Sequence, residues 1–266
     1  MLILLSPAKT LDFESPLPTR KSSQPSMVED SQELVDVLVR KSPHDIASMM
    51  SLSESLAELN AERFQHWEPT FNKQNSRPAL LAFKGDVYVG MDVGRYGERD
   101  FTHAQKTVRI LSGLHGVLRP LDLIQPYRLE MGTSLENPRG KNLYEFWGDK
   151  VTDAINRDLE ERRSNLVVNL ASNEYFGVVQ PDRVEGRIVS PVFLDEKNGE
   201  FKIISFFAKK ARGAMASWLV LNRAKTAKAI TEFDGLGYGY DPERSTATRP
   251  VFLRHELSSG VGASAS

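Results

Sequence analysis

The sequence predicts a mixed α/β fold, a single compact domain with a mixed sheet and flanking helices. Residues 2–5 and 166–170 are apolar runs without polar alternation, which is typical of strands covered on both faces. Segments with the spacing of amphipathic helices lie between them. Asn198-Gly199 separates two further apolar segments, and this dipeptide is a strong hairpin signal. We expect residues 1–255 to form the domain and 256–266 to be a disordered tail.

Composition narrows the class of protein. The 266 residues are 40% hydrophobic and 26% charged, as in soluble globular proteins. The absence of cysteine excludes disulfides, thiolate catalysis and cysteine-ligated metal centres, and it fits a cytoplasmic location. We expect no membrane partner, because no apolar stretch is long enough to span a bilayer and the apolar N-terminus is too short for a signal peptide. The net charge is −1, so any affinity for nucleic acid must come from a local basic cluster.

The first strand, residues 2–5, leads into a small polar loop. Ser6, Lys9 and Thr10 in this loop can together satisfy one phosphate or carboxylate. Loops at strand ends are where α/β proteins bind ligands. The alternative is a surface loop in which Lys9 is simply solvated.

Three helices are expected next, at residues 28–40, from Ser42 onward and at 53–65. Ser42 is followed by Pro43 and, three residues on, by Asp45, which is a strong helix start. An apolar run at residues 79–83 then precedes Lys84-Gly85-Asp86, a second polar cluster at the end of an apolar segment. A plain Gly-Asp turn explains the glycine equally well.

Residues 106–132 predict a phosphate-binding element. Val108 and Leu111 have helical spacing, and Gly113 can adopt the left-handed conformation that ends a helix. A tight turn and a second short helix after Gly116 would complete a helix-hairpin-helix, whose free amides attract phosphate. The alternative is an ordinary helical corner in a core. The residues assigned to phosphate binding here are Arg109, Gly113, Leu114, His115, Gly116, Arg119 and Arg128.

A hairpin and a helix follow in the C-terminal part. Strands are predicted at residues 187–194 and 201–207, and a helix at 208–222 with Lys209, Lys210 and Arg212 near its start. Cations at a helix N-terminus oppose the helix dipole. A broken local rule of this kind favours an anion site over a solvated basic face.

An enzyme is the alternative function. Polar clusters follow three apolar runs, and the residues we single out as candidate catalytic groups are Lys9, Asp86, Glu130, Ser172 and Glu174. Their chemistry suits a nucleotide or another small acidic or phosphorylated ligand. An iron-binding protein ranks third, because Asp86, Glu130 and Glu174 offer oxygen ligands without a spacing signature. The five histidines share no ligand spacing, so we predict no metal site and no cofactor.

Several motifs resemble one family. They are LLSPAKTLD at residues 4–12, AFKGDVY at 82–88, LSGLHGVLRPLD at 111–122, QPYRLEMG at 125–132, NLAS at 169–172, FLDEKNG at 193–199 and ISFFAKKARG at 204–213. The chain resembles the YaaA family of bacterial peroxide-stress resistance proteins from residue 1 to about 255.

The resemblance implies a cytoplasmic protein of the hydrogen-peroxide response that limits oxidative and iron-driven DNA damage. It also implies a basic cleft and a helix-hairpin-helix that bind duplex and branched DNA with little sequence preference. The family's motif falls on Gly113, Leu114 and Gly116, and its basic positions fall on Lys9, Arg119, Arg128, Lys209, Lys210 and Arg212. No established reaction comes with the family, so DNA binding is the first hypothesis and an enzyme the second.

Overall fold

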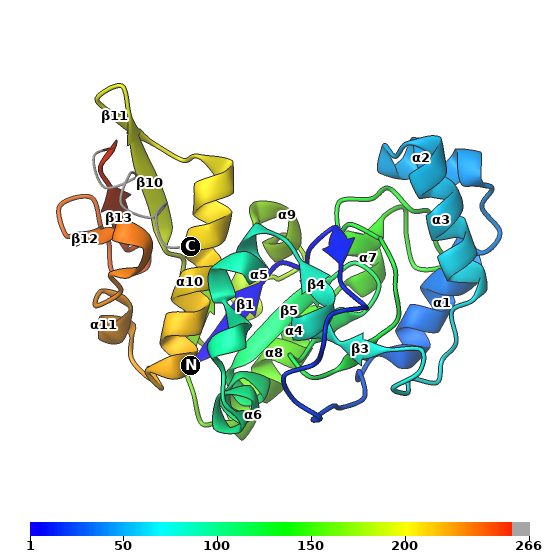
Figure 1. The fold of residues 1–266 in the computed structure, drawn as a ribbon, viewed down its shortest axis with the longest axis horizontal. Coiled ribbons are helices and arrows are strands. Elements are labelled where there is room, and N and C mark those ends of the chain that lie inside the picture. Colours follow the sequence, from blue (N-terminus) through cyan, green and yellow to red (C-terminus); the bar gives the residue numbers. More distant parts are fainter. Residues whose placement is uncertain (257–266) are drawn as a thin grey trace.

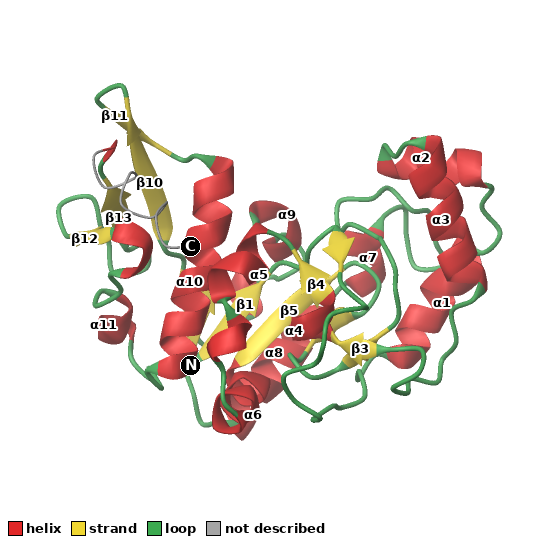
Figure 2. Ribbon diagram, in the orientation of Figure 1, coloured by secondary structure: helices red, strands yellow, loops and turns green. Residues whose placement is uncertain are grey.

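A five-stranded sheet forms the centre of the computed structural model, which describes residues 1–256 (Figures 1 and 2). Its strands stand in the order β6-β5-β1-β8-β9. Their bounds are β1 Leu2–Leu5, β5 Val108–Ser112, β6 Gly116–Leu118, β8 Leu166–Asn169 and β9 Arg187–Val189. β5, β1, β8 and β9 run parallel, whereas β6 pairs antiparallel with β5. Because parallel strands end at one edge of the sheet, the loops after β1 and β8 meet there.

The two apolar runs of the sequence occupy the middle of this sheet. β1 lies between β5 and β8, with Ile3 opposite both Val108 and Val168. Every residue of β1 and the first three of β8 are buried. The prediction of strands covered on both faces is confirmed, and so is the mixed α/β fold class. Of the predicted tail, 256–266, all but Glu256 lies outside the described residues.

A second sheet has four strands in the order β11-β10-β13-β12. Their bounds are β10 Val192–Lys197, β11 Glu200–Lys202, β12 Gly239–Asp241 and β13 Val251–Arg254. Asn198 and Gly199 join β10 to β11 with φ values of 57° and 78°. Positive φ at both turn residues is what a tight hairpin between twisted strands needs. The predicted hairpin is therefore confirmed.

The second strand of that hairpin is shorter than predicted. β11 ends at Lys202, and the helix α10 runs from Ser205 to Leu221. The apolar residues that suggested a strand up to residue 207 instead begin the helix. Lys209, Lys210 and Arg212 therefore lie beyond the first turn, where their conflict with the helix dipole is weaker than the sequence implied.

Two short ladders and the other helices complete the fold. The ladders pair β2 Thr10–Leu11 with β4 Phe83–Lys84, and β3 Arg77–Pro78 with β7 Leu123–Ile124. The helices up to the middle of the chain are α1 Val28–Leu38, α2 Pro43–Met50, α3 Glu54–Gln65, α4 Ala79–Ala82, α5 Asp86–Met91, η1 Val93–Arg95 and α6 Glu98–Thr107. The later ones are α7 Leu143–Trp147, α8 Lys150–Glu161, α9 Asn173–Phe176, η2 Pro181–Arg183, α11 Ala227–Ile230 and η3 Gly235–Gly237. Ser42 and Asp45 form a capping box, which confirms the predicted start of α2.

The predicted helix-hairpin-helix at residues 106–132 is wrong. α6 ends at Thr107, residues 108–112 form β5 beside β1, and β6 replaces the second helix. Val108 and Leu111 do fit helical spacing, but Val108 and Ile110 are β-branched residues that pair with β1. The positive φ, 62°, belongs to Gly116, the first residue of β6, and not to Gly113 in the turn before it.

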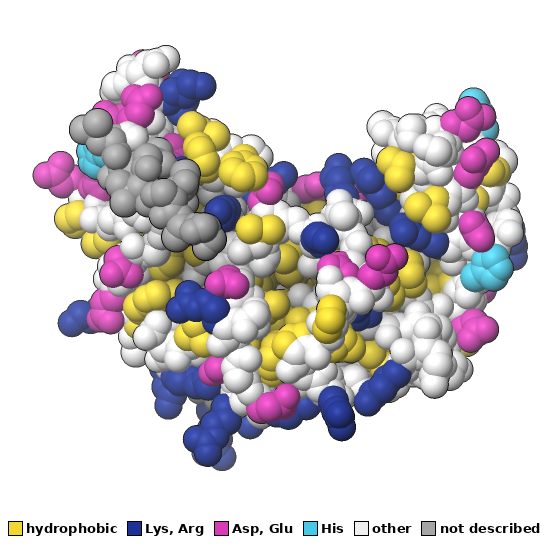
Figure 3. All heavy atoms as spheres, viewed as in Figure 1, with side chains coloured by type: hydrophobic (Ala, Val, Ile, Leu, Met, Phe, Trp, Pro, Cys, Tyr) yellow, Lys and Arg dark blue, Asp and Glu magenta, His cyan; other side chains and the backbone are white. Residues whose placement is uncertain are grey.

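One face of the molecule is concave (Figure 3). In the view of Figure 1, the hollow lies between α10 with the β10–β11 hairpin on one side and α2 with α3 on the other. α9, β4 and the end of β1 lie beneath it. Lys and Arg side chains gather on its floor, with some Asp and Glu among them (Figure 3).

Candidate functional site

A cavity of about 530 Å³ opens at the carboxyl ends of β1 and β8, and we call it the central cavity. Its walls come from the loop after β1, the start of α5, the loop after β8 with α9, and α10. These elements lie at the floor of the concave face and along its α10 side (Figures 1 and 3). The charged residues that line it are Lys9, Lys84, Asp86, Glu130, Glu174, Lys209 and Arg212.

The polar clusters that the sequence shows far apart meet in this cavity. The Ser6 hydroxyl donates to Ser172 Oγ at 3.3 Å, and the Ser172 amide donates to Ser6 Oγ at 2.8 Å. The Lys84–Asp86 segment joins them because β4 pairs with β2, with Lys84 opposite Thr10. All five candidate catalytic residues line the central cavity, together with Lys209 and Arg212 from the predicted phosphate-binding set.

Glu130 is the most heavily paired carboxylate of the central cavity. Lys9 Nζ lies 2.7 Å from Glu130 Oε2, and Arg128 Nη2 donates to Glu130 Oε1 at 3.1 Å. The side chain of Lys9 remains 63% exposed, so it can still reach a ligand. Glu174 accepts a hydrogen bond of 3.0 Å from the Gly132 amide. Two of the three carboxylates are thus held in place by neighbouring groups.

Lys209 and Arg212 differ from these paired groups. Within residues 1–256, neither side chain has a hydrogen bond or an ion pair. Arg212 is partly buried, and this burial lowers the pKa of its guanidinium without a carboxylate to compensate. A cation that is partly desolvated and unpaired gains the most from an incoming anion.

Sequence reasoning missed two tyrosines of the central cavity. The Tyr88 hydroxyl donates to the Ser6 carbonyl at 3.0 Å. Burial raises the pKa of both Tyr88 and Tyr175, so both remain protonated hydrogen-bond donors at neutral pH. The available signal was their position, because each directly follows a polar cluster at the end of an apolar run.

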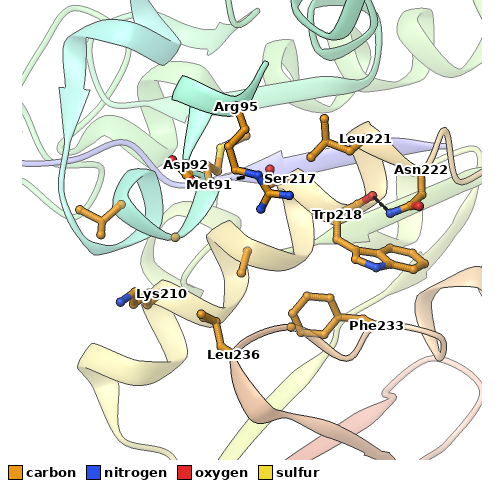
Figure 4. Close-up of a pocket in the computed structure, with 14 residues that line it drawn as sticks. Met91, Asp92, Arg95, Lys210, Ser217, Trp218, Leu221, Asn222, Phe233 and Leu236 are labelled. Carbon is orange, nitrogen blue, oxygen red and sulfur yellow. Dashed lines mark hydrogen bonds and ion pairs between the residues drawn. The ribbon is translucent and has the colours of Figure 1, made fainter. Parts of the chain in front are cut away.

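The three cations of α10 do not share one site. Lys209 and Arg212 are three residues apart, so they lie on one face of the helix and both line the central cavity. Lys210 is turned to another face. It lines a cavity of about 560 Å³ with Arg95, Trp218 and Phe233 (Figure 4).

The predicted hairpin residues lie inside the molecule. Leu114 is fully buried and His115 is 1% exposed. A Cβ on Gly113 would lie 2.4 Å from the Leu129 carbonyl oxygen, and one on Gly116 would lie 2.6 Å from Met27 Sδ. Buried groups of this kind offer no surface to a phosphate, so the predicted amide site is not formed.

Arg109 and Arg119 also lie away from the central cavity. Arg109 is 2% exposed and forms an ion pair with Asp158, with Nε 2.5 Å from Asp158 Oδ2. Arg119 Nη2 lies 2.9 Å from Asp122 Oδ1. Both arginines line a different cavity, of about 330 Å³, with Arg157. The predicted phosphate-binding set is therefore divided between the core and separate surfaces.

The described residues contain neither a candidate metal centre nor a candidate membrane span. Among the residues described here, no three His, Cys, Asp or Glu side chains are grouped closely enough to hold a metal ion. Asp86, Glu130 and Glu174 line one cavity without forming such a group. Within residues 1–256, every helix is too short or too polar to cross a bilayer.

Comparisons with known proteins identify relatives along nearly the whole chain. The family described as peroxide stress protein YaaA matches residues 1–244. A UPF0246 protein of Alcanivorax borkumensis is 54% identical over 256 residues, which are 96% of this chain and 99% of that protein. A UPF0246 protein of Shewanella baltica strain OS223 is 53% identical over 256 residues, 96% of this chain and all of that protein.

Proposed function

Because the chain belongs to the peroxide stress protein YaaA family, and so has a role in the bacterial response to peroxide stress, we propose that it performs this role by binding the phosphate backbone of DNA. The binding surface is the floor of the concave face, at the central cavity. The buried β5–β6 turn takes no part, because it has no accessible surface.

One observation supports this proposal above the others. Lys9, Lys84, Lys209 and Arg212 come from three separate segments and line one open cavity. Such a local cluster is what a protein with a net charge of −1 needs to attract a polyanion. The unpaired Lys209 and Arg212 contribute most, because no protein carboxylate within the described chain must be displaced from them.

Phosphate contacts position a protein on DNA but contain no information about base sequence. We therefore expect binding that depends strongly on salt and little on sequence. Each lysine or arginine that neutralises a phosphate adds about one unit to the slope of log affinity against log salt concentration.

The test is duplex binding by Lys209→Ala and Arg212→Ala, measured by fluorescence anisotropy on two unrelated sequences over a range of salt concentrations. Both variants are expected to weaken binding to the two sequences equally and to flatten the salt slope. Arg157→Ala is the matched control, since it removes one exposed cation from a different cavity. Equal affinity and slope for all three folded variants would contradict the proposal.

A small phosphorylated or acidic substrate is the second candidate. Its support is the presence of Glu130, Glu174 and Asp86 beside the cations, since a site made only for a polyanion gains nothing from carboxylates. Protonated Tyr175 adds a hydrogen-bond donor for such a ligand, whereas the hydroxyl of Tyr88 already donates to the Ser6 carbonyl. In this case the carboxylates act on the substrate, and their removal abolishes protection against peroxide without weakening DNA binding.

A further inference from the structure

A second cavity adjoins the central cavity and shares Arg212 with it. This cavity has a volume of about 570 Å³ and lies among the end of β8, α9, the start of β10 and α10, so we call it the β10 cavity. Arg212 lines both cavities. Arg212 therefore borders two cavities whose linings differ in chemistry.

The loop after β8 forms the wall between the two cavities. Leu170 and Ser172 line the central cavity, whereas Ala171 and Asn173 line the β10 cavity. Ser172 has an extended backbone, with φ −72° and ψ 161°. Successive residues of an extended segment point to opposite sides, which explains the alternation. A ligand that crosses this wall next to Arg212 can occupy both cavities.

The β10 cavity combines positive charge with apolar walls, so it suits an anion that also has an apolar part. Its lining includes Arg212 and Arg249 but no Asp or Glu. Within the part of the chain that the structure describes, neither arginine side chain has an ion pair, and the Asn173 side-chain amide has no hydrogen bond. Phe176 and Ile188 are among the apolar residues of the walls.

We propose that the two cavities together bind one nucleotide unit, with the phosphate on Arg212 and Lys209 and the base in the β10 cavity. The guanidinium of Arg212 matches the oxygens of a phosphate in a bidentate arrangement. The apolar walls take the faces of the base, and the free amide of Asn173 hydrogen-bonds its polar edge. This inference rests on the proposed function, because it uses the same cations for phosphate.

The ligand chemistry excludes the plain duplex backbone as the occupant of the β10 cavity. In a duplex the bases are stacked and paired, so only an unpaired nucleotide presents a base to a pocket. Such a nucleotide comes either from a single-stranded region of DNA or from a free mononucleotide. Both sources present the same phosphate and base, so an experiment must distinguish between them.

The test compares four probes on the full chain by calorimetry or anisotropy. The probes are inorganic phosphate, 2′-deoxyadenosine 5′-monophosphate, a single-stranded oligonucleotide and a duplex of the same sequence. The mononucleotide is expected to bind at least tenfold more tightly than inorganic phosphate. If the single strand competes with it, DNA is the source of the nucleotide. If the mononucleotide binds and the single strand does not compete, the free nucleotide is the ligand.

Two variants locate the base, and neither removes a side-chain hydrogen bond or an ion pair within residues 1–256. Asn173→Ala and Arg249→Ala are expected to weaken binding of the mononucleotide, or of the single strand, at least fivefold and to leave duplex affinity unchanged. Arg157→Ala is the control for lost charge. Mononucleotide binding no tighter than that of phosphate would overturn the inference, as would variants with wild-type affinities for both nucleotide probes. The backbone proposal fails separately, through duplex affinity that does not respond to Lys209→Ala or Arg212→Ala.

Discussion

Gly90 of α5 and Gly213 of α10 bring the backbones of these helices into direct contact. A Cβ on Gly90 would lie 2.0 Å from the Lys210 carbonyl oxygen, and one on Gly213 would lie 1.7 Å from the Val87 carbonyl oxygen. No L side chain fits at either position unless the helices separate. The contact sets the width of the central cavity, because the start of α5 lines one side of it and Arg212 of α10 another.

Gly213→Ala is expected to destabilise the protein by about 3 kcal/mol, since even one methyl group must push α5 away from α10. Urea denaturation measures the loss. Duplex affinity is expected to fall in the protein that remains folded, because the cations of the central cavity move apart. Gly94→Ala is the control, since its Cβ would lie 3.8 Å from Asp92 Oδ1, the nearest atom, with room to spare. A wild-type unfolding midpoint for Gly213→Ala would show that the helix contact is not tight.

Asp158→Ala is expected to cost roughly 3–5 kcal/mol of unfolding free energy, because it leaves the guanidinium of Arg109 buried without a carboxylate, with only the Gln105 and Val108 carbonyls as acceptors. Replacing both members, as Arg109→Met with Asp158→Leu, should restore most of the stability. The control on the same helix is Asp153→Ala, which removes an exposed pair with Arg183 and should cost less than about 1 kcal/mol. Equal losses from Asp158→Ala and Asp153→Ala would contradict the role of burial.

His115 makes stability depend on pH. Burial lowers the pKa of His115 from 6.5 to about 3, so below pH 6.5 the unfolded chain binds a proton that the folded protein does not. As the pH is lowered below 6.5, the free energy of unfolding therefore decreases by about 1.4 kcal/mol per pH unit, until pH 3 is approached. Above pH 6.5 this contribution is absent.

The histidine contribution is isolated with His115→Gln, which does not titrate. Between pH 6.5 and pH 5, the wild-type protein should lose about 2 kcal/mol more than this variant. Denaturation curves at several pH values give both slopes, so the loss that the substitution itself causes at pH 7 does not enter the comparison. Parallel slopes would mean that His115 is protonated in the folded protein.

Glu130→Gln separates the two candidate functions. The variant frees Lys9 and Arg128 from their shared carboxylate, so duplex affinity is expected to rise by a factor of roughly two to five. If the chain protects cells by binding DNA, survival under hydrogen peroxide should follow affinity across Glu130→Gln, Glu174→Gln and Lys209→Ala. A glutamate variant that binds DNA but no longer protects would favour the small-substrate function. Glu58→Gln, on the exposed side of α3, is the charge control.

The polar clusters of the site could be recognised from the sequence, but their meeting could not. Ser6 with Lys9, Lys84 with Asp86, and Ser172 with Glu174 are each visible because polar residues directly follow an apolar run. Nothing local indicates that β1 stands beside β8, or that β4 pairs with β2, since strand order depends on contacts between residues far apart in the sequence.

The dependence on contacts between distant residues also explains why a helix was wrongly predicted at residues 108–112. Residues 108–112 fit helical spacing as well as they fit a strand, and pairing with β1 decided between the two. The burial of Arg109 was likewise invisible, because its partner Asp158 lies on a helix much later in the chain.

By itself, the sequence determined the fold class, the central strands, the β10–β11 hairpin and the start of α2. Each depends on neighbouring residues: an unbroken apolar run, the Asn198-Gly199 turn, and the cap formed by Ser42 and Asp45. The tertiary structure alone decided which cations share a cavity. Lys209 and Arg212 face the central cavity and Lys210 does not, because the position of α10 against α5 determines which face of the helix is turned to the ligand.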